Sequence, residues 1–347
     1  MRLLDRLFSW FGKTSATGLL EPDGAVATAV LHEHVAAAGA SAQPPVLAWW
    51  VPQGEPLLLD PAPQALAQTP ETDLHRRLTA VLDDPNLELP RLPQTAHRAL
   101  LLLRDENLDY RRLARLVAHD PAVAAQFLRV ANSAAYGGVR KAKNLEVAFS
   151  RLGHRKIRST VIATGVKGLT LQVGGAERTR GEEIWRRSLA SAAILGQMAG
   201  RFHLHAEEMF LIGLLHDLGM LAVLRVLHDY ERQHAREIPR SLFDRLSLDW
   251  HEPLGQHLAH AWNLPDPLPE LIGDHHRAVQ RNDPLAQQRA LIQFADAACS
   301  MIGYGPYVPY DFFNLPCVQF LGLTDEPATH QLLSRLPAAI TDRLELF

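Results

Sequence analysis

The sequence contains very little cysteine. Its 347 residues include only Cys299 and Cys317, and these two do not form a CxxC pair. A disulfide framework and a thiolate zinc site are both excluded by so few thiols at this spacing. A reducing compartment such as the cytoplasm is therefore expected.

Long apolar runs and a one-signed charge are also lacking. No segment reaches the ~18 uninterrupted apolar residues of a membrane-spanning helix, and the N-terminus has no signal-peptide pattern. The 35 basic and 38 acidic side chains give a net charge of −3, so no global field attracts the chain to nucleic acid or anionic membranes. We expect a cytoplasmic protein whose contacts with anions, if any, are local.

Several catalytic signatures are absent as well. The sequence has no GxSxG, Walker loop, GxGxxG or HExxH pattern. With 47% hydrophobic and 21% charged residues it is nevertheless a folded chain, long enough for two or three domains. Any chemistry must come from residues that are far apart in the sequence.

The first 13 residues predict a short amphipathic helix. Its charged side chains lie off the apolar face, and its net charge of +2 together with Trp10 would suit peripheral contact with the inner face of a membrane. The alternative is a helix that packs on its own protein. The apolar face consists of Leu3, Leu4, Leu7, Phe8 and Phe11.

The remaining chain divides into three parts. Residues 14–85 are rich in proline, and the apolar runs Val46–Val51 and Leu57–Leu59 could pair as strands, which predicts a small α+β module or an irregular linker. Residues 86–302 show helical periodicity without βαβ alternation and predict an all-α domain. Residues 303–347 form a C-terminal extension. The predicted helices cover 95–104, 109–118, 121–131, 145–152, 154–166, 182–201, 206–230, 241–261, 267–276 and 285–302.

Histidine is concentrated in one region of the chain. Ten of the 17 histidines lie between residues 203 and 276. Within this region, residues 209–227 predict an apolar helix interrupted only by His216, Asp217 and Arg225. An ionised carboxylate on a buried helix costs several kcal/mol unless a cation, hydrogen bonds or a metal compensates it. His216 and Asp217 must therefore have partners.

Candidate partners follow later in the sequence, at His251, His275, His276 and Asp296. Neutral imidazole and carboxylate are ligands that suit zinc, iron, nickel or manganese. Two such ions could activate a hydroxide and attack a phosphoester, which would give Asp217 a catalytic role. Equally, four helices can bring polar groups together only to satisfy one another.

These residues are part of a larger pattern that resembles the HDOD domain, an HD-related output domain of bacterial signalling proteins. The resemblance spans about residues 86–300 and implies a multi-helix, mainly α, HD-like fold. Its landmarks appear in order as Leu89–Pro93 (LPxLP), Asp120-Pro121, Ala131–Ser133 with Tyr136-Gly137, Leu152-Gly153, Trp185 near Ser188, Gly213–Gly219, Trp262–Pro265, His275-His276 and Asp296.

One departure from the wider HD superfamily concerns the first metal ligand. Metal-dependent relatives carry a histidine in a W-x-H-S-like setting, where this chain reads Trp185-Arg186-Arg187-Ser188. Arg187 stays protonated and cannot donate electrons to a metal. We expect a degenerate site with one divalent transition metal or none, in which Arg187 beside Asp217 and Asp296 supplies the positive charge.

A second departure weakens the resemblance to cyclic-dinucleotide phosphodiesterases. Those relatives have a Gly-Tyr-Pro segment soon after the double histidine, and this chain has none there. The similar segment Gly303–Pro306 (GYGP) lies beyond Asp296 and predicts only a turn that ends a helix.

Residues 140–158 are strongly basic and could contact an anionic partner. The alternative interpretation is a solvated helix face, and a stacking groove for single-stranded nucleic acid is not indicated. The basic residues concerned are Arg140, Lys141, Lys143, Arg155, Lys156 and Arg158.

Three functions remain open from the sequence. The first is a non-catalytic signalling module with no required cofactor, whose partners the resemblance places among bacterial signalling proteins, including those of cyclic-dinucleotide pathways. The second is a metal-dependent phosphohydrolase acting on a nucleotide or cyclic dinucleotide. The third and weakest is a nucleic-acid binder that uses residues 140–158.

Overall fold

The computed structural model describes residues 70–83, 90, 92–105, 108–137, 140–170, 176–305 and 311–347. All of these residues belong to one compact unit, Leu58–Phe347. The predicted amphipathic helix at 1–13 and the predicted strands at 46–59 lie outside the described residues and stay predictions.

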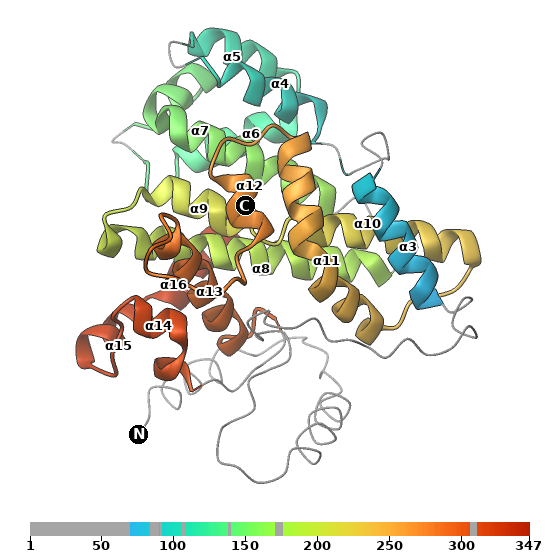
Figure 1. The fold of residues 1–347 in the computed structure, drawn as a ribbon. Coiled ribbons are helices and arrows are strands. Elements are labelled where there is room, and N and C mark those ends of the chain that lie inside the picture. Colours follow the sequence, from blue (N-terminus) through green and yellow to red (C-terminus); the bar gives the residue numbers. More distant parts are fainter. Residues whose placement is uncertain are drawn as a thin grey trace, which may run out of the picture. The chain divides into compact units, whose positions relative to one another are not determined.

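The described part of the chain is helical and contains no strand (Figure 1), which confirms the predicted all-α class. Two short 3-10 helices, Ala199–Phe202 and Phe312–Asn314, accompany the α-helices. The α-helices are α3 (Pro70–Asp83), α4 (Gln94–Leu102), α5 (Tyr110–Ala118), α6 (Pro121–Ala131), α7 (Leu145–Thr170), α8 (Ala176–Met198), α9 (Ala206–Leu215), α10 (Gly219–His234), α11 (Arg240–Ala261), α12 (Leu268–Gly273), α13 (Ala286–Met301), α14 (Pro316–Phe320), α15 (Pro327–Leu333) and α16 (Leu336–Leu346).

Local signals in the sequence set several helix ends. The Asp120 side chain accepts a hydrogen bond from the backbone N–H of Val123 at 3.2 Å, and Pro121 follows at the first helical position. Gly153, between the segments 145–152 and 154–166 that were predicted as helices, has a φ of 71°, a conformation that favours glycine. The chain bends there and continues directly into the second half of α7.

The prediction of a single helix over 206–230 is wrong. The chain leaves regular α-helix at His216–Leu218, where Leu218 donates to the carbonyl of Leu215 and Met220 to that of Asp217. These bonds span three residues instead of four, so the backbone tightens into a turn. The turn separates α9 from α10 and directs the His216 and Asp217 side chains inward.

The stretch Ala206–His234 is long and apolar enough to cross a membrane by length and composition alone. Of its most apolar window, 83% is buried inside the protein. Its apolar surface is therefore already covered by neighbouring helices, as in the core of a folded domain.

The helices form two connected groups (Figure 1). In the first, α7 packs on α4, α5 and α6. In the second, α8 packs on α9, α10 and α13, and α10 packs on α11. Helix α3 lies on α10 and α11, and α16 lies on α8. The compact unit thus extends beyond the predicted boundaries at residues 86 and 302, because elements on both sides cover the same core.

Two glycines let α10 and α11 approach closely. A Cβ atom built on Gly219 would lie 1.9 Å from the carbonyl oxygen of His251 and 2.6 Å from the amide nitrogen of Gly255. Both neighbours are backbone atoms, so they cannot move aside as a flexible side chain would. The contact places the start of α10 directly against His251 in α11, which belongs to the site described below.

We expect the Gly219→Ala substitution to lower the free energy of unfolding by at least ~2 kcal/mol, because it forces these two backbones apart. Chemical denaturation of the purified protein measures this change. Gly200→Ala is the matched control, since a Cβ there meets nothing within 4 Å. Equal stability changes in the two variants would contradict the prediction.

Candidate metal centre

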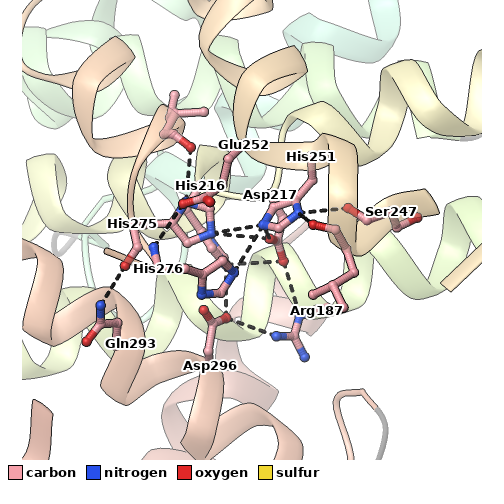
Figure 2. Close-up of polar contacts among 12 residues, drawn as sticks. Arg187, His216, Asp217, Ser247, His251, Glu252, His275, His276, Gln293 and Asp296 are labelled. Atoms are coloured by element: carbon pink, nitrogen blue, oxygen red, sulfur yellow. Dashed lines mark hydrogen bonds and ion pairs between the residues drawn. The ribbon is translucent and has the colours of Figure 1, made fainter. Parts of the chain in front are cut away.

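Six predicted site residues and Arg187 meet at one place inside the second helix group (Figure 2). Arg187 comes from α8, while the turn between α9 and α10 supplies a histidine and an aspartate. Helix α11, the turn after α12 and helix α13 supply the rest. The seven residues are Arg187, His216, Asp217, His251, His275, His276 and Asp296.

The site is almost completely shielded from solvent. The His216 and His275 side chains have no exposed surface, and Asp217 and Asp296 are 3% and 1% exposed. Charges at this depth are stable only when they are paired and hydrogen-bonded. The arrangement of partners therefore decides what each group can do.

Arg187 joins the two buried carboxylates. Its Nε donates to Asp217 Oδ2 at 3.1 Å and its Nη2 to Asp296 Oδ1 at 2.9 Å. Burial by itself would lower the pKa of Arg187, but the two carboxylates raise it above its usual value. The guanidinium is thus a fixed positive charge between Asp217 and Asp296.

His216 completes this first cluster. Its Nδ1–H donates to the carbonyl of Gly213 at 2.8 Å, and its Nε2 lies 3.1 Å from Asp296 Oδ1 and 3.2 Å from Asp217 Oδ2. Burial disfavours the charged imidazole, but the two carboxylates outweigh it and raise the pKa of His216 to about 10. The pKa of Asp217 is held well below its usual range despite burial, chiefly by His216 and Arg187.

A second cluster consists of His251, His275 and His276. The Nε2 atom of His251 lies 3.3 Å from that of His275 and 3.1 Å from that of His276. Burial and the neighbouring imidazoles hold the pKa values of His275 and His276 well below their ordinary value. Asp217 Oδ1 lies 3.9 Å from the Nε2 atoms of His251 and His275 and so reaches toward both.

The protons of this second cluster point away from its centre. His251 Nδ1–H donates to the carbonyl of Ser247 at 2.7 Å, and His275 Nδ1–H donates to that of Ile272 at 3.0 Å. In the neutral rings both Nε2 atoms therefore carry lone pairs, which face each other. Only His276 can place a proton between them.

This donor set fits a divalent transition metal. Two facing lone pairs repel each other, whereas a cation between the imidazoles and Asp217 would bind both of them. His276 Nδ1 and Asp296 Oδ2 are also buried without a hydrogen-bond partner among the described residues. The ligand atoms of His251, His275 and His276 all lie within 4.8 Å of one another, as do those of His216, Asp217 and Asp296.

Outer contacts fix the double histidine in place. Glu252 accepts the backbone N–H of His276 at 2.9 Å, and Gln293 Nε2 donates to the carbonyl of His275 at 2.8 Å. The fully buried Arg289 donates to the carbonyl and the carboxylate of Asp274 at 3.1 and 2.7 Å. Arg289 was not predicted, although it is the one basic residue of the helical segment 286–301.

The turn after α13 has a role that the sequence did not reveal. Arg187 Nη1 donates to the carbonyl of Tyr304 at 3.1 Å. Gly305 has a φ of 141°, and a Cβ built on it would lie 2.4 Å from Arg187 Nη1. The glycine-tyrosine-glycine turn therefore closes around the guanidinium as well as ending the helix.

The predicted basic surface at 140–158 is only partly available to a partner. Arg140, Lys141 and Lys143 are exposed, and Arg155 lies 3.4 Å from Glu208 on the surface. Lys156 is 2% exposed and pairs with Glu207 at 3.2 Å, so it cannot contribute to that surface. It was misjudged because helical periodicity does not show that a facing acid covers one of these lysines.

Comparison with known proteins agrees with this fold. Residues 89–278, more than half of the chain, match the model of the HDOD domain. A solved structure from Shewanella amazonensis SB2B, with the provisional name metal-dependent phosphohydrolase, superposes with a TM-score of 0.60 at 21% identity over 78% of this chain and 99% of that one. A provisionally named signal transduction protein from Marinobacter aquaeolei VT8 gives 0.54 at 18% identity, over 79% and 65%. At these identities the likeness shows the fold alone.

One relative extends well beyond this chain. An uncharacterised protein from Treponema pallidum (strain Nichols) is 25% identical over 272 residues, which are 74% of this chain and 51% of the relative. The chain thus spans about half the length of that protein.

We expect Arg187→Met to lower the free energy of unfolding by about 3–5 kcal/mol, because it leaves two buried carboxylates with only His216 as a cation. Urea denaturation measures the loss. Arg178→Met removes an exposed ion pair with Glu182 and should cost at most about 0.5 kcal/mol. A loss below about 1 kcal/mol for Arg187→Met would show that the bridge does not stabilise the fold.

Lys156 predicts a pH dependence of stability. Burial is the main cause that lowers its pKa from 10.5 to about 8, and Arg343 adds to the effect. Between pH 8 and 10.5 the unfolded chain keeps a proton that the folded chain has lost, so the stability of the wild type rises with pH. Relative to Lys156→Met, we expect a gain of up to roughly 3 kcal/mol across this window.

Denaturation curves recorded at several pH values between 7 and 11 test this expectation. The exposed Lys141→Met variant is the control and should track the wild type at every pH. A wild-type stability that stays constant or falls relative to Lys156→Met would contradict it.

Proposed function

Because this chain belongs to the HDOD domain family, we propose that it is a bacterial signal-transduction module that hydrolyses no phosphoester and acts through contacts with other proteins. A single observation carries the proposal. The Arg187 guanidinium bridges Asp217 and Asp296, with His216 beside both carboxylates. Two carboxylates that could hold a first metal ion are thus already bound to a cation of the protein, and the imidazole of His216 bonds to both of them.

The positive charge of Arg187 balances the negative charge of the two buried carboxylates. Asp217 and Asp296 are both held ionised, and together they need positive charge in a buried place. A guanidinium supplies that charge along with directional hydrogen bonds, but it cannot accept a lone pair from water and so cannot activate a water molecule by coordination as a metal ion does. The first cluster therefore keeps the stability of an occupied site without its chemistry.

The second cluster supports a finer proposal about metal. His251, His275, His276 and Asp217 Oδ1 would hold a single divalent transition metal. A metal bound there would act as a Lewis acid and lower the pKa of a bound water. Asp217 would then serve both clusters, with Oδ2 on Arg187 and Oδ1 toward the imidazoles.

A metal-dependent phosphohydrolase is the second candidate function, and the three converging imidazoles favour it. The name of the Shewanella protein is compatible with this candidate, as the name of the Marinobacter protein is with signalling. Hydrolysis by a pair of ions uses carboxylates that both ions share. Arg187 occupies one side of that arrangement, so we prefer the non-catalytic function.

Partners and location are part of the proposal. We propose that the module works in the cytoplasm and that its partners are signalling proteins, including those of cyclic-dinucleotide pathways. Peripheral membrane contact by residues 1–13 is a prediction from the sequence alone. Nucleic acid is disfavoured, because the basic segment loses Lys156 to Glu207 and no net positive charge attracts a polyanion.

A turnover assay tests the function. The full chain is incubated with bis-p-nitrophenyl phosphate, nucleotides and cyclic dinucleotides in the presence of Mn²⁺, Fe²⁺ or Ni²⁺. We expect no hydrolysis above that of metal and buffer alone. Hydrolysis by the wild type that Asp217→Asn abolishes would overturn the proposal in favour of the phosphohydrolase.

Metal content provides a measurement that does not depend on activity. Elemental analysis after dialysis should find at most one metal ion per chain in the wild type. Arg187→His restores a donor next to Asp217 and Asp296 and should bind one ion more than the wild type. Equal metal content in both proteins would show that Arg187 does not block a metal position.

A further inference from the structure

A groove lies where the two helix groups meet, away from the metal centre. Its walls come from α4, from α7 and from the turn that follows α11. We call it the Trp262 groove. Its principal lining residues are His97, Leu101, Arg104, Arg158, Trp262 and Leu264.

The groove is lined by positive charge and, within the described part of the chain, by no acidic residue. Arg104 and Arg158 both line it, and none of its described lining residues is acidic. Arg158 uses one Nη2 bond to the carbonyl of Leu103 at 3.2 Å, and the Arg104 side chain bonds to none of the described residues. Most N–H groups of these two guanidinium groups are therefore available to an anion, and arginine is well suited to bind one.

Apolar surface lies next to these charges. Leu101 is 47% exposed and is one of three large hydrophobic side chains exposed in the described chain, with Val147 and Leu248. Behind it, Trp262 and Leu264 are each 8% exposed and form an apolar floor. Arginine and tryptophan are enriched in protein-binding hot spots, and Leu101 adds exposed apolar surface beside them.

The groove is held in shape by bonds from its lining residues to the surrounding backbone. The Trp262 indole N–H donates to the carbonyl of Pro90 at 3.0 Å. The Leu103 carbonyl accepts from both His154, at 2.8 Å, and Arg158. Because these contacts exist without a ligand, little ordering remains to be done when one binds.

We propose that the Trp262 groove binds a short acidic segment of a partner protein, in which a carboxylate lies beside a leucine-sized apolar side chain. The carboxylate would bind Arg104 and Arg158, and the apolar side chain would cover Leu101. The inference rests on the proposed function, since it names the partner surface of a module that acts through protein contacts. It also gives Arg158 an anionic partner, while Arg104 adds a residue that the basic segment 140–158 did not include.

Four blocked tetrapeptides test the proposal by separating charge from apolarity: Glu-Leu-Leu-Glu, Glu-Ser-Ser-Glu, Lys-Leu-Leu-Lys and Lys-Ser-Ser-Lys. Each is titrated into the full chain with ¹³C-labelled leucine and isoleucine methyl groups. We expect only Glu-Leu-Leu-Glu to shift the methyl signals of Leu100, Leu101, Ile162 and Leu264 in a saturable way.

Exposed substitutions then locate the binding. Arg104→Glu should weaken Glu-Leu-Leu-Glu at least tenfold and make Lys-Leu-Leu-Lys the better ligand, and Leu101→Asp should also abolish binding. The matched controls Arg112→Glu and Val147→Asp change exposed residues outside the groove and should bind like the wild type. Circular dichroism verifies that all four variants are folded.

Several results would overturn the inference. These are equal shifts with all four peptides, no shift with any, or binding that Arg104→Glu leaves unchanged. Tighter binding of an oligothymidylate than of Glu-Leu-Leu-Glu would assign the groove to nucleic acid instead. None of these results affects the turnover assay. The two experiments therefore distinguish a failure of the proposed peptide binding from a failure of the proposed non-catalytic function.

Discussion

The bridge from Arg187 to Asp217 and Asp296 is the interaction on which the centre of this protein depends. Two carboxylates with almost no exposed surface cannot remain ionised without compensating charge. The guanidinium supplies that charge from α8, and the turn containing Tyr304 holds it from the other side. One guanidinium thus ties α8 to the α9–α10 turn and to α13 through two ion pairs.

Helix packing creates the second half of the site. Because Gly219 and Gly255 lack side chains, α10 and α11 meet at backbone distance, and His251 reaches the imidazoles that follow α12. Asp217 lies between the halves, with one oxygen on Arg187 and the other facing His251 and His275. The histidine and aspartate side chains of the site thus form two clusters with different properties. One cluster is neutralised by its own arginine, and the other keeps lone pairs that fit an ion.

The proposed non-catalytic function assigns the activity of the domain to its surface. A buried polar core bridged by Arg187 leaves the surface free to offer partner sites elsewhere. The Trp262 groove lies at the junction of the two helix groups, so a ligand there would contact elements of both. The groove depends on α4 and α7, which supply no residue to the metal centre.

The amino-acid sequence by itself determined the helical class, many helix ends and the identity of the site residues. Asp120 and Gly153 act through their own backbone neighbourhood, and the clustered histidines and the HDOD landmarks can be read in order along the chain. Only the tertiary structure decided that the helix predicted over 206–230 breaks at His216 and that Lys156 is buried against Glu207. It also decided that Tyr304 contacts Arg187, that Arg289 holds Asp274 and that Arg104 lines the Trp262 groove. The physical reason is range. Caps and periodicity act over a few residues, whereas burial and charge pairing join groups that lie 50 to more than 100 positions apart.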